Sequence, residues 1–161
     1  MQNGQILTNQ KGKIKMSIYT EFKAGNSIKL DKFITQYMVF AFGQEQYERK
    51  LKELGLTDAE FQKKYVGFLG GAMRADKVEE YKQISEEMHT NMRNKMLTDK
   101  EFAKEAFNYE MGNFEVFYSN RYDEVFGSLC VSRKDLAEYP DLADAFQQAK
   151  KEYWAWCIEN C

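Results

Sequence analysis

A single proline, Pro140, occurs in the 161 residues of this chain. Because proline breaks helices and removes a hydrogen bond from strands, a chain almost free of it can form long uninterrupted helices. No cluster of proline, glycine or serine long enough to act as a linker follows residue 27. The sequence therefore predicts one domain over residues 16–161, preceded by a disordered basic tail over residues 1–15.

Apolar residues recur at the i, i+3, i+4, i+7 spacing of one helical face in several segments. These segments run from Leu30 to Ala41, from about Asp76 to Met96, from Thr98 to Met111, and from about Asp141 to Trp156. For the first segment, a short strand over residues 37–42 is the alternative. Residues 65–74 mix apolar residues with glycine, which favours a tight loop or a short strand.

Helix starts share one pattern: a polar or glycine cap, an apolar residue before it, and a second apolar residue four places after the cap. The four examples are Phe42-Gly43 with Tyr47, Leu56-Thr57 with Phe61, Leu97-Thr98 with Phe102, and Val131-Ser132 with Leu136. In two of them a glutamate three residues after the cap, Glu60 or Glu101, completes a capping box. The predicted fold is mainly α: a compact single-domain bundle of about five to seven helices, with room for a short β-hairpin.

Charge and apolar patterning exclude several classes of protein. The 23 basic and 25 acidic residues give a net charge of -2, which is too balanced for a nucleic-acid groove. The longest apolar run, Met38–Phe42, is too short for a membrane span or a signal peptide. Three cysteines in a chain of this size favour a reducing cytoplasm without disulfides. We expect a cytoplasmic protein that does not bind a membrane.

The single histidine, His89, limits the available chemistry. It follows Glu86 at the i, i+3 spacing of di-iron bundles, but such a site needs a second copy of the motif and two more carboxylates. A solvated helix face is the more economical interpretation. Two cysteines near the end of the chain, Cys157 and Cys161, provide only half of a tetrahedral metal site. We therefore expect no metal, no cofactor and no catalytic residue.

The stretch from Phe107 to Tyr118 places polar residues among aromatic ones, and its candidate ligand-binding residues are Tyr109, Glu110, Asn113 and Glu115. On a helix, Tyr109 lies one turn before Asn113, Glu110 reaches Asn113 at i, i+3, and Glu115 lies on a different side. A buried glutamate beside asparagine and tyrosine can recognise a small polar ligand or a peptide. The alternative, which we favour, is an internal hydrogen-bonding network that fixes helix packing.

Four stretches of the chain resemble a family of small uncharacterised proteins from phages, mobile elements and their bacterial hosts. They are Phe40–Tyr47, the Gly70-Gly71 pair, Phe107–Glu115 and Ala149–Tyr153. Two positions depart from the family pattern as we know it: a polar residue usually stands at Gly43, and a histidine at Phe114. The resemblance implies an origin in a mobile element or a gut bacterium, and it implies no activity and no catalytic residue.

Aromatic residues, 12 Phe, 10 Tyr and 2 Trp, exceed what one core requires, and tyrosine and tryptophan are favoured at interfaces. We therefore expect a non-enzymatic phage or mobile-element accessory protein that binds a host macromolecule, a protein, through Trp154 and Trp156. One alternative is a small enzyme or ligand-binding protein that uses Glu110 and Glu115. Another is nucleic-acid binding through the tail from Lys11 to Lys15 and the region of Arg121. The sequence leaves the oligomeric state open.

Overall fold

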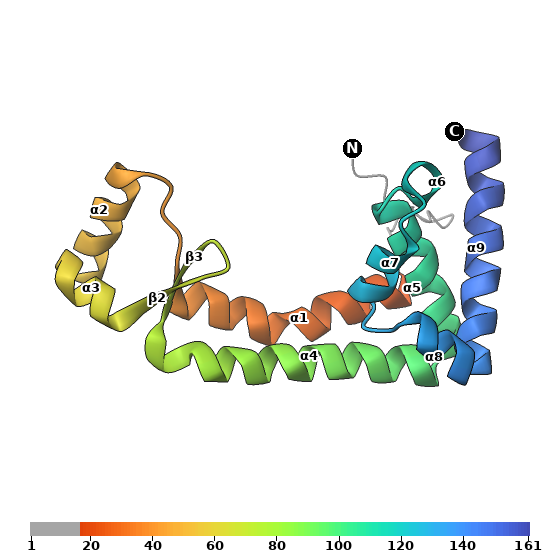
Figure 1. Ribbon diagram of the computed structural model, residues 1–161, viewed down its shortest axis with the longest axis horizontal. Helices are drawn as coiled ribbons and strands as arrows, with labels where there is room; N and C mark the ends of the chain where they lie inside the picture. The colour runs from red at the N-terminus through yellow and green to blue at the C-terminus, as the bar shows by residue number, and fades with distance from the viewer. Residues whose placement is uncertain (1–16) are drawn as a thin grey trace, which may run out of the picture. The chain divides into compact units, whose positions relative to one another are not determined.

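The computed structural model describes residues 17–161, which form nine α-helices, a short 3-10 helix and three strands (Figure 1). This confirms a mainly α fold with a short β-hairpin, although the described residues hold more helices than the five to seven expected. The structure divides into two compact units. Unit 1 contains residues 17–26 and His89–Cys161, and unit 2 contains Ser27–Met88. The predicted tail lies outside the described residues, and the single domain over residues 16–161 stays a prediction.

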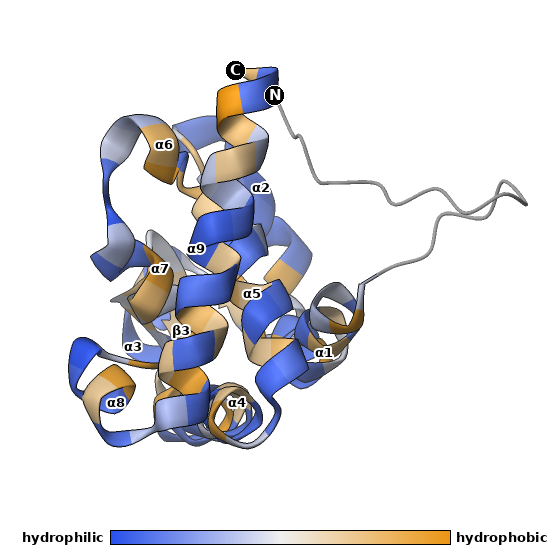
Figure 2. Ribbon diagram, turned by 90° about the vertical axis from the view of Figure 1, so that its right-hand side faces the viewer, coloured by the Kyte–Doolittle hydropathy of each residue, from blue (hydrophilic) through white to orange (hydrophobic). Residues whose placement is uncertain are grey.

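Two long helices form the centre of unit 1. Helix α5 (Lys100–Asn113) lies beside α9 (Pro140–Asn160), which carries Pro140 in its first turn as predicted (Figure 1). Polar and apolar residues alternate along α9 in Figure 2, as a helix with one buried face requires. The short helices α6 (Val116–Ser119), α7 (Tyr122–Ser128) and α8 (Arg133–Glu138) complete the unit. Its core contains twenty buried residues.

Helix α4 (Val78–Thr98) is the long helix predicted from Asp76 to Met96, and the 3-10 turn η1 (Ala75–Lys77) precedes it. The capping box predicted at Thr98 is wrong. The cap of α5 is Asp99, whose carboxylate accepts a hydrogen bond from the Phe102 amide at 3.0 Å. The Thr98 hydroxyl instead donates to the carbonyl of Asn94, because Thr98 still belongs to α4.

The other predicted helix starts are confirmed. Helix α2 (Gln44–Leu54) begins after Gly43, and α3 (Asp58–Lys64) begins after Thr57 with the capping box to Glu60. Helix α8 begins after Ser132, which forms a capping box with Asp135. At α3 and α8, local sequence identifies the start because the cap side chain satisfies a backbone group within three residues of itself, whereas Gly43 makes no such side-chain bond.

Helix α1 (Ile18–Tyr37) begins twelve residues before Leu30, the first residue of the predicted apolar face. The helix ends at Tyr37 although the apolar spacing continues beyond it, because the chain becomes extended in strand β1 (Met38–Val39). Both alternatives for this region are thus partly right. Helix spacing holds up to Tyr37, and an extended segment follows it.

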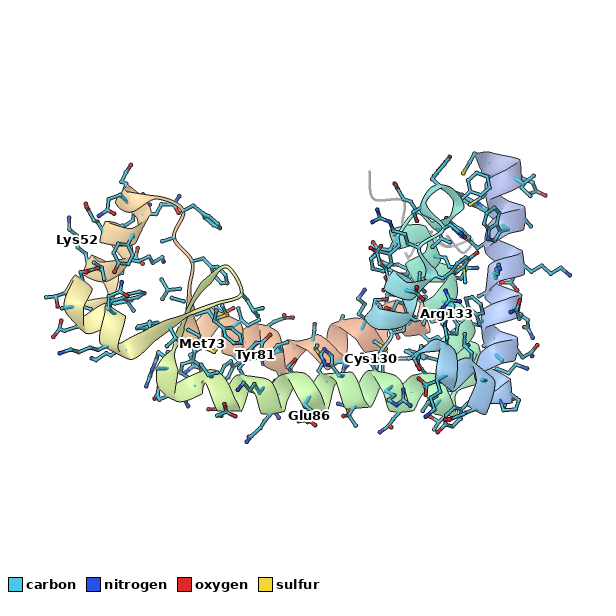
Figure 3. The ribbon with its side chains drawn as sticks, in the orientation of Figure 1. Lys52, Met73, Tyr81, Glu86, Cys130 and Arg133 are labelled. Atoms are coloured by element: carbon cyan, nitrogen blue, oxygen red, sulfur yellow. The ribbon has the colours of Figure 1, made fainter. Side chains whose placement is uncertain are left out.

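Residues 65–74 form a β-hairpin of strands β2 (Tyr65–Phe68) and β3 (Gly71–Arg74), and the sheet order is β1-β3-β2, all antiparallel. The two-residue turn has positive φ at both positions, 47° at Leu69 and 78° at Gly70, as in a type I′ hairpin. Met73 and Tyr81, labelled in Figure 3, belong to the core of unit 2 and its surroundings. That core contains only five buried residues, Leu30, Phe33, Met38, Met73 and Ile84.

Candidate functional site

A buried carboxylate lies in unit 1, at Glu110 on the inner face of α5. Its side chain is fully buried, and the hydroxyl of Tyr19 from α1 donates a hydrogen bond to it. The Nζ of Lys23, one turn further along α1, lies 2.6 Å from the same carboxylate oxygen. The amide of Asn113 donates to the other oxygen at 3.0 Å. Three donors therefore satisfy a group that would be costly to bury alone.

Aromatic rings surround the ammonium group of Lys23. Its Nζ lies 5.5 Å from the ring centroid of Tyr19 and 5.5 Å from that of Tyr109, while the two rings are 5.4 Å apart. Burial, together with the Glu110 carboxylate, raises the pKa of the Tyr19 hydroxyl, which therefore remains a hydrogen-bond donor. Lys23 therefore makes cation–π contacts with both rings.

Three of the four ligand-binding candidates thus lie together, as Tyr109, Glu110 and Asn113 share one network on α5. Glu115 does not join them, because it lies beyond the end of α5 with a φ of 48° and its side chain is exposed. Glu110 and Glu115 do not form the pair of enclosed carboxylates that acid–base chemistry would require. The geometry supports the internal hydrogen-bonding network. Ligand binding by these residues stays a prediction.

Sequence reasoning missed Tyr19 and Lys23. They are 91 and 87 residues away from Glu110 in the chain, and only the folding of unit 1 brings them to it. The sequence feature that could have identified them is their i, i+4 spacing, which places Tyr19 and Lys23 on the same face of a helix. Helix α1 was not expected to extend so far toward the N-terminus.

A second buried carboxylate, Asp135 of α8, was also missed. Arg93 of α4 donates to both of its oxygens, at 2.6 and 2.8 Å, and to the carbonyl of Cys130 at 3.2 Å. The backbone amide and hydroxyl of Ser132 complete the set. The hydrogen bonds from Arg93 and Ser132 hold the pKa of Asp135 well below its usual range. Arg93 therefore links α8 to α4 through these hydrogen bonds.

The two tryptophans of the predicted binding patch differ in environment. Trp154 is half-buried: its indole N–H donates to the Tyr122 hydroxyl at 2.9 Å, and its ring lies 5.1 Å from that of Phe117. Trp156 is exposed, on a different side of α9. Trp154 thus helps to pack unit 1, and Trp156 remains accessible. Their role in partner binding stays a prediction.

Unit 2 exposes a group of apolar side chains that carry no polar atom. We call Phe40, Phe42, Val66 and Leu69 the hairpin surface, and they are 42%, 77%, 43% and 66% exposed. Phe40 lies against the hairpin, because its ring would come within 2.8 Å of a Cβ atom at Gly71. Exposed aromatic and aliphatic side chains of this size are candidates for contact with a partner.

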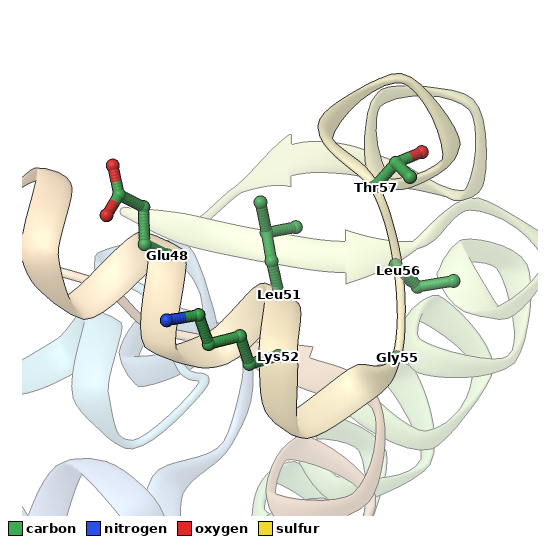
Figure 4. Close-up of a pocket in the computed structure, with 6 residues that line it drawn as sticks. All are labelled: Glu48, Leu51, Lys52, Gly55, Leu56 and Thr57. Atoms are coloured by element: carbon green, nitrogen blue, oxygen red, sulfur yellow. The ribbon is translucent and has the colours of Figure 1, made fainter.

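A hollow of about 470 Å³ lies in unit 2 where α2 turns into α3 (Figure 4). Its lining residues are Glu48, Leu51, Lys52, Gly55, Leu56 and Thr57. The two leucines make part of this lining apolar, which suits an apolar side chain of a partner.

Within residues 17–161, no group of three or more histidine, cysteine, aspartate or glutamate side chains is placed to hold a metal ion. Over the same range, no helix has the length and apolar content needed to cross a membrane. The three cysteines are free thiols; Cys157 is buried and Cys161 is exposed.

Residues 29–152 match the model of a family of unknown function, DUF7659. The matched range includes most of the four stretches on which the sequence resemblance depends. Searches of curated proteins and of solved structures found no match.

Proposed function

The chain belongs to DUF7659, a family of unknown function, and we propose that it is a non-enzymatic protein that binds another protein through the hairpin surface of unit 2. The observation that supports this proposal is the exposure of four apolar side chains, Phe40, Phe42, Val66 and Leu69. The core cluster of the same unit contains only five buried residues. Exposed apolar side chains are unfavourable in water, and covering them with a partner lowers the free energy of the system.

The charges of unit 2 favour a protein over a nucleic acid as the partner. Six of its basic side chains pair with carboxylates: Lys29, Arg49, Lys50, Arg74, Lys77 and Lys82. Locally neutralised cations do not form the continuous basic stripe that attracts phosphates.

We further propose that the chain is an accessory protein of a phage or mobile element, that its partner belongs to the host, and that it acts in the cytoplasm. The sequence resemblance supports the origin and therefore the source of the partner. The three free thiols suit a reducing compartment.

Affinity capture from a host lysate tests the proposal when wild type is compared with three variants. The double variant Phe42→Ser/Leu69→Ser removes two exposed apolar side chains of the hairpin surface. Ile158→Ser is the matched control, because Ile158 is an equally exposed apolar residue of unit 1. Trp156→Ala tests the surface that the sequence predicted.

We expect a protein that wild type and Ile158→Ser both capture and that the double variant loses. Its affinity for the purified double variant should fall about tenfold or more, because well-placed interface side chains contribute over 1 kcal/mol each. Loss with Trp156→Ala alone would instead place the binding surface on α9. Equal capture by all four proteins would contradict a role for either surface.

A further inference from the structure

The β-hairpin of unit 2 ends in an open sheet edge. Among the strands of residues 17–161, β2 pairs with β3 alone, so one of its sides has no neighbouring strand in that range. In a two-residue hairpin the pair that closes the turn, here Phe68 and Gly71, exchanges both hydrogen bonds. Pairs alternate along the ladder, so Gly67 and Ala72 form a non-hydrogen-bonded pair. The N–H and C=O of Gly67 therefore point away from β3, toward the open edge.

This edge lacks the charges, prolines and bulges that often prevent pairing. Natural edge strands carry charges, prolines or bulges that block another strand. Strand β2 has the sequence Tyr-Val-Gly-Phe, without a charge or a proline, and its register with β3 is regular. Gly67 is exposed, and no hydrogen bond from outside the sheet reaches it within residues 17–161. An edge in this state accepts an extended polypeptide strand.

We propose that the strand which pairs with this edge is β2 of a second copy of the chain, in an antiparallel two-fold arrangement centred on Gly67. In this register the two Gly67 residues face each other and exchange both of their outward hydrogen bonds. Val66 of each copy then lies opposite Phe68 of the other, on the same face of the sheet. The paired sheets form one sheet of six strands.

Self-complementarity favours a second copy as the occupant. The segment from Tyr65 to Leu69 carries no charge, so two copies meet without like-charge repulsion. Val66 and Phe68 are a β-branched and an aromatic residue, a combination that stabilises cross-strand pairs. Glycine at the two-fold axis leaves room for the two backbones to approach. This pairing goes beyond the proposed binding function and does not depend on it.

Two substitutions at Gly67 separate pairing from folding. A Cβ atom at Gly67 would meet nothing within 4 Å, and its φ lies outside the left-handed region, so alanine fits the folded hairpin. Gly67→Pro removes the outward N–H without removing a bond to β3. Gly67→Ala keeps that N–H and serves as the matched control. Far-UV circular dichroism and thermal unfolding of both variants test that each one keeps the fold.

Sedimentation equilibrium over micromolar to millimolar concentrations measures the outcome. We expect the average mass of wild type and Gly67→Ala to rise from 19.0 kDa toward twice that value. The Gly67→Pro variant should dimerise about 30-fold more weakly, because each dimer loses two backbone hydrogen bonds.

A wild type that stays monomeric at millimolar concentration overturns the proposal. A dimer that Gly67→Pro leaves unchanged also overturns it and places the contact elsewhere. Neither result affects the capture experiment with Phe42→Ser/Leu69→Ser, so the two proposals fail separately.

Discussion

Unit 1 and unit 2 bury their apolar residues to different extents. The core cluster of unit 1 contains twenty buried residues, and that of unit 2 contains five, with Phe61 buried apart from it. Each unit also exposes six large apolar or aromatic side chains, but those of unit 1 include three tyrosines and a tryptophan, whereas those of unit 2 carry no polar atom. Unit 1 is therefore organised for its own stability, and unit 2 retains apolar surface that a partner can cover.

The buried polar groups follow the same division. Glu110 and Asp135, the two buried charged residues of the described chain, both lie in unit 1. Each is held by donors from another helix, which specifies how the helices of that unit pack. In unit 2 the ion pairs of Lys29, Arg49 and Lys82 are exposed and contribute little to stability. Four substitutions test this contrast.

Phe107→Ala should have the largest effect. Phe107 is fully buried in unit 1, and its ring contacts those of Phe126 and Phe146. Its removal leaves a cavity and should lower the free energy of unfolding by about 4 kcal/mol. Urea denaturation measures this loss. A cost below about 1 kcal/mol would show that the core of unit 1 is not the main source of stability.

Glu110→Ala should lower the free energy of unfolding by about 3 kcal/mol, because it leaves the Tyr19 hydroxyl and the Asn113 amide without their acceptor. Lys23→Met is the control. Lys23 is half-exposed, so its ammonium group can be removed at lower cost. A double-mutant cycle of the two substitutions in urea denaturation measures their coupling. Additive effects would mean that the ion pair between them contributes nothing.

Asp135→Asn should lower the free energy of unfolding by about 2 kcal/mol at neutral pH and by much less at acidic pH. The pKa of Asp135 is lower in the folded protein, so the folded state binds fewer protons than the unfolded state. The stabilisation is complete above the unfolded pKa of about 3.9 and is lost as the pH falls through the folded pKa. Urea denaturation of wild type and variant between pH 2 and 7 should show this convergence on acidification. A constant difference would contradict the assigned role of Arg93.

Phe42→Ser should have the smallest effect, below about 0.5 kcal/mol, because its ring is already exposed to water. Thermal unfolding of wild type and variant measures the difference. A loss comparable to that of Phe107→Ala would mean that Phe42 is covered in solution, and the contrast between the units would fail.

Local sequence patterns determined much of the fold. The starts of α2, α3 and α8, the course of α4 and the Pro140 start of α9 depend on residues a few places apart, so caps and apolar spacing are enough to predict them. The same patterns placed Asn113 beside Glu110, because that contact lies within one helical turn.

Tertiary structure decided which side chains meet across the chain and which remain in water. Tyr19 and Lys23 reach Glu110, and Arg93 reaches Asp135, over 91, 87 and 42 residues of sequence. No local rule encodes such contacts, because they depend on how whole helices pack. The same packing covers Trp154, exposes Trp156 and Phe42, and leaves one edge of β2 open. Apolar spacing alone identifies residues that can be buried, but burial also requires a neighbouring element to cover them.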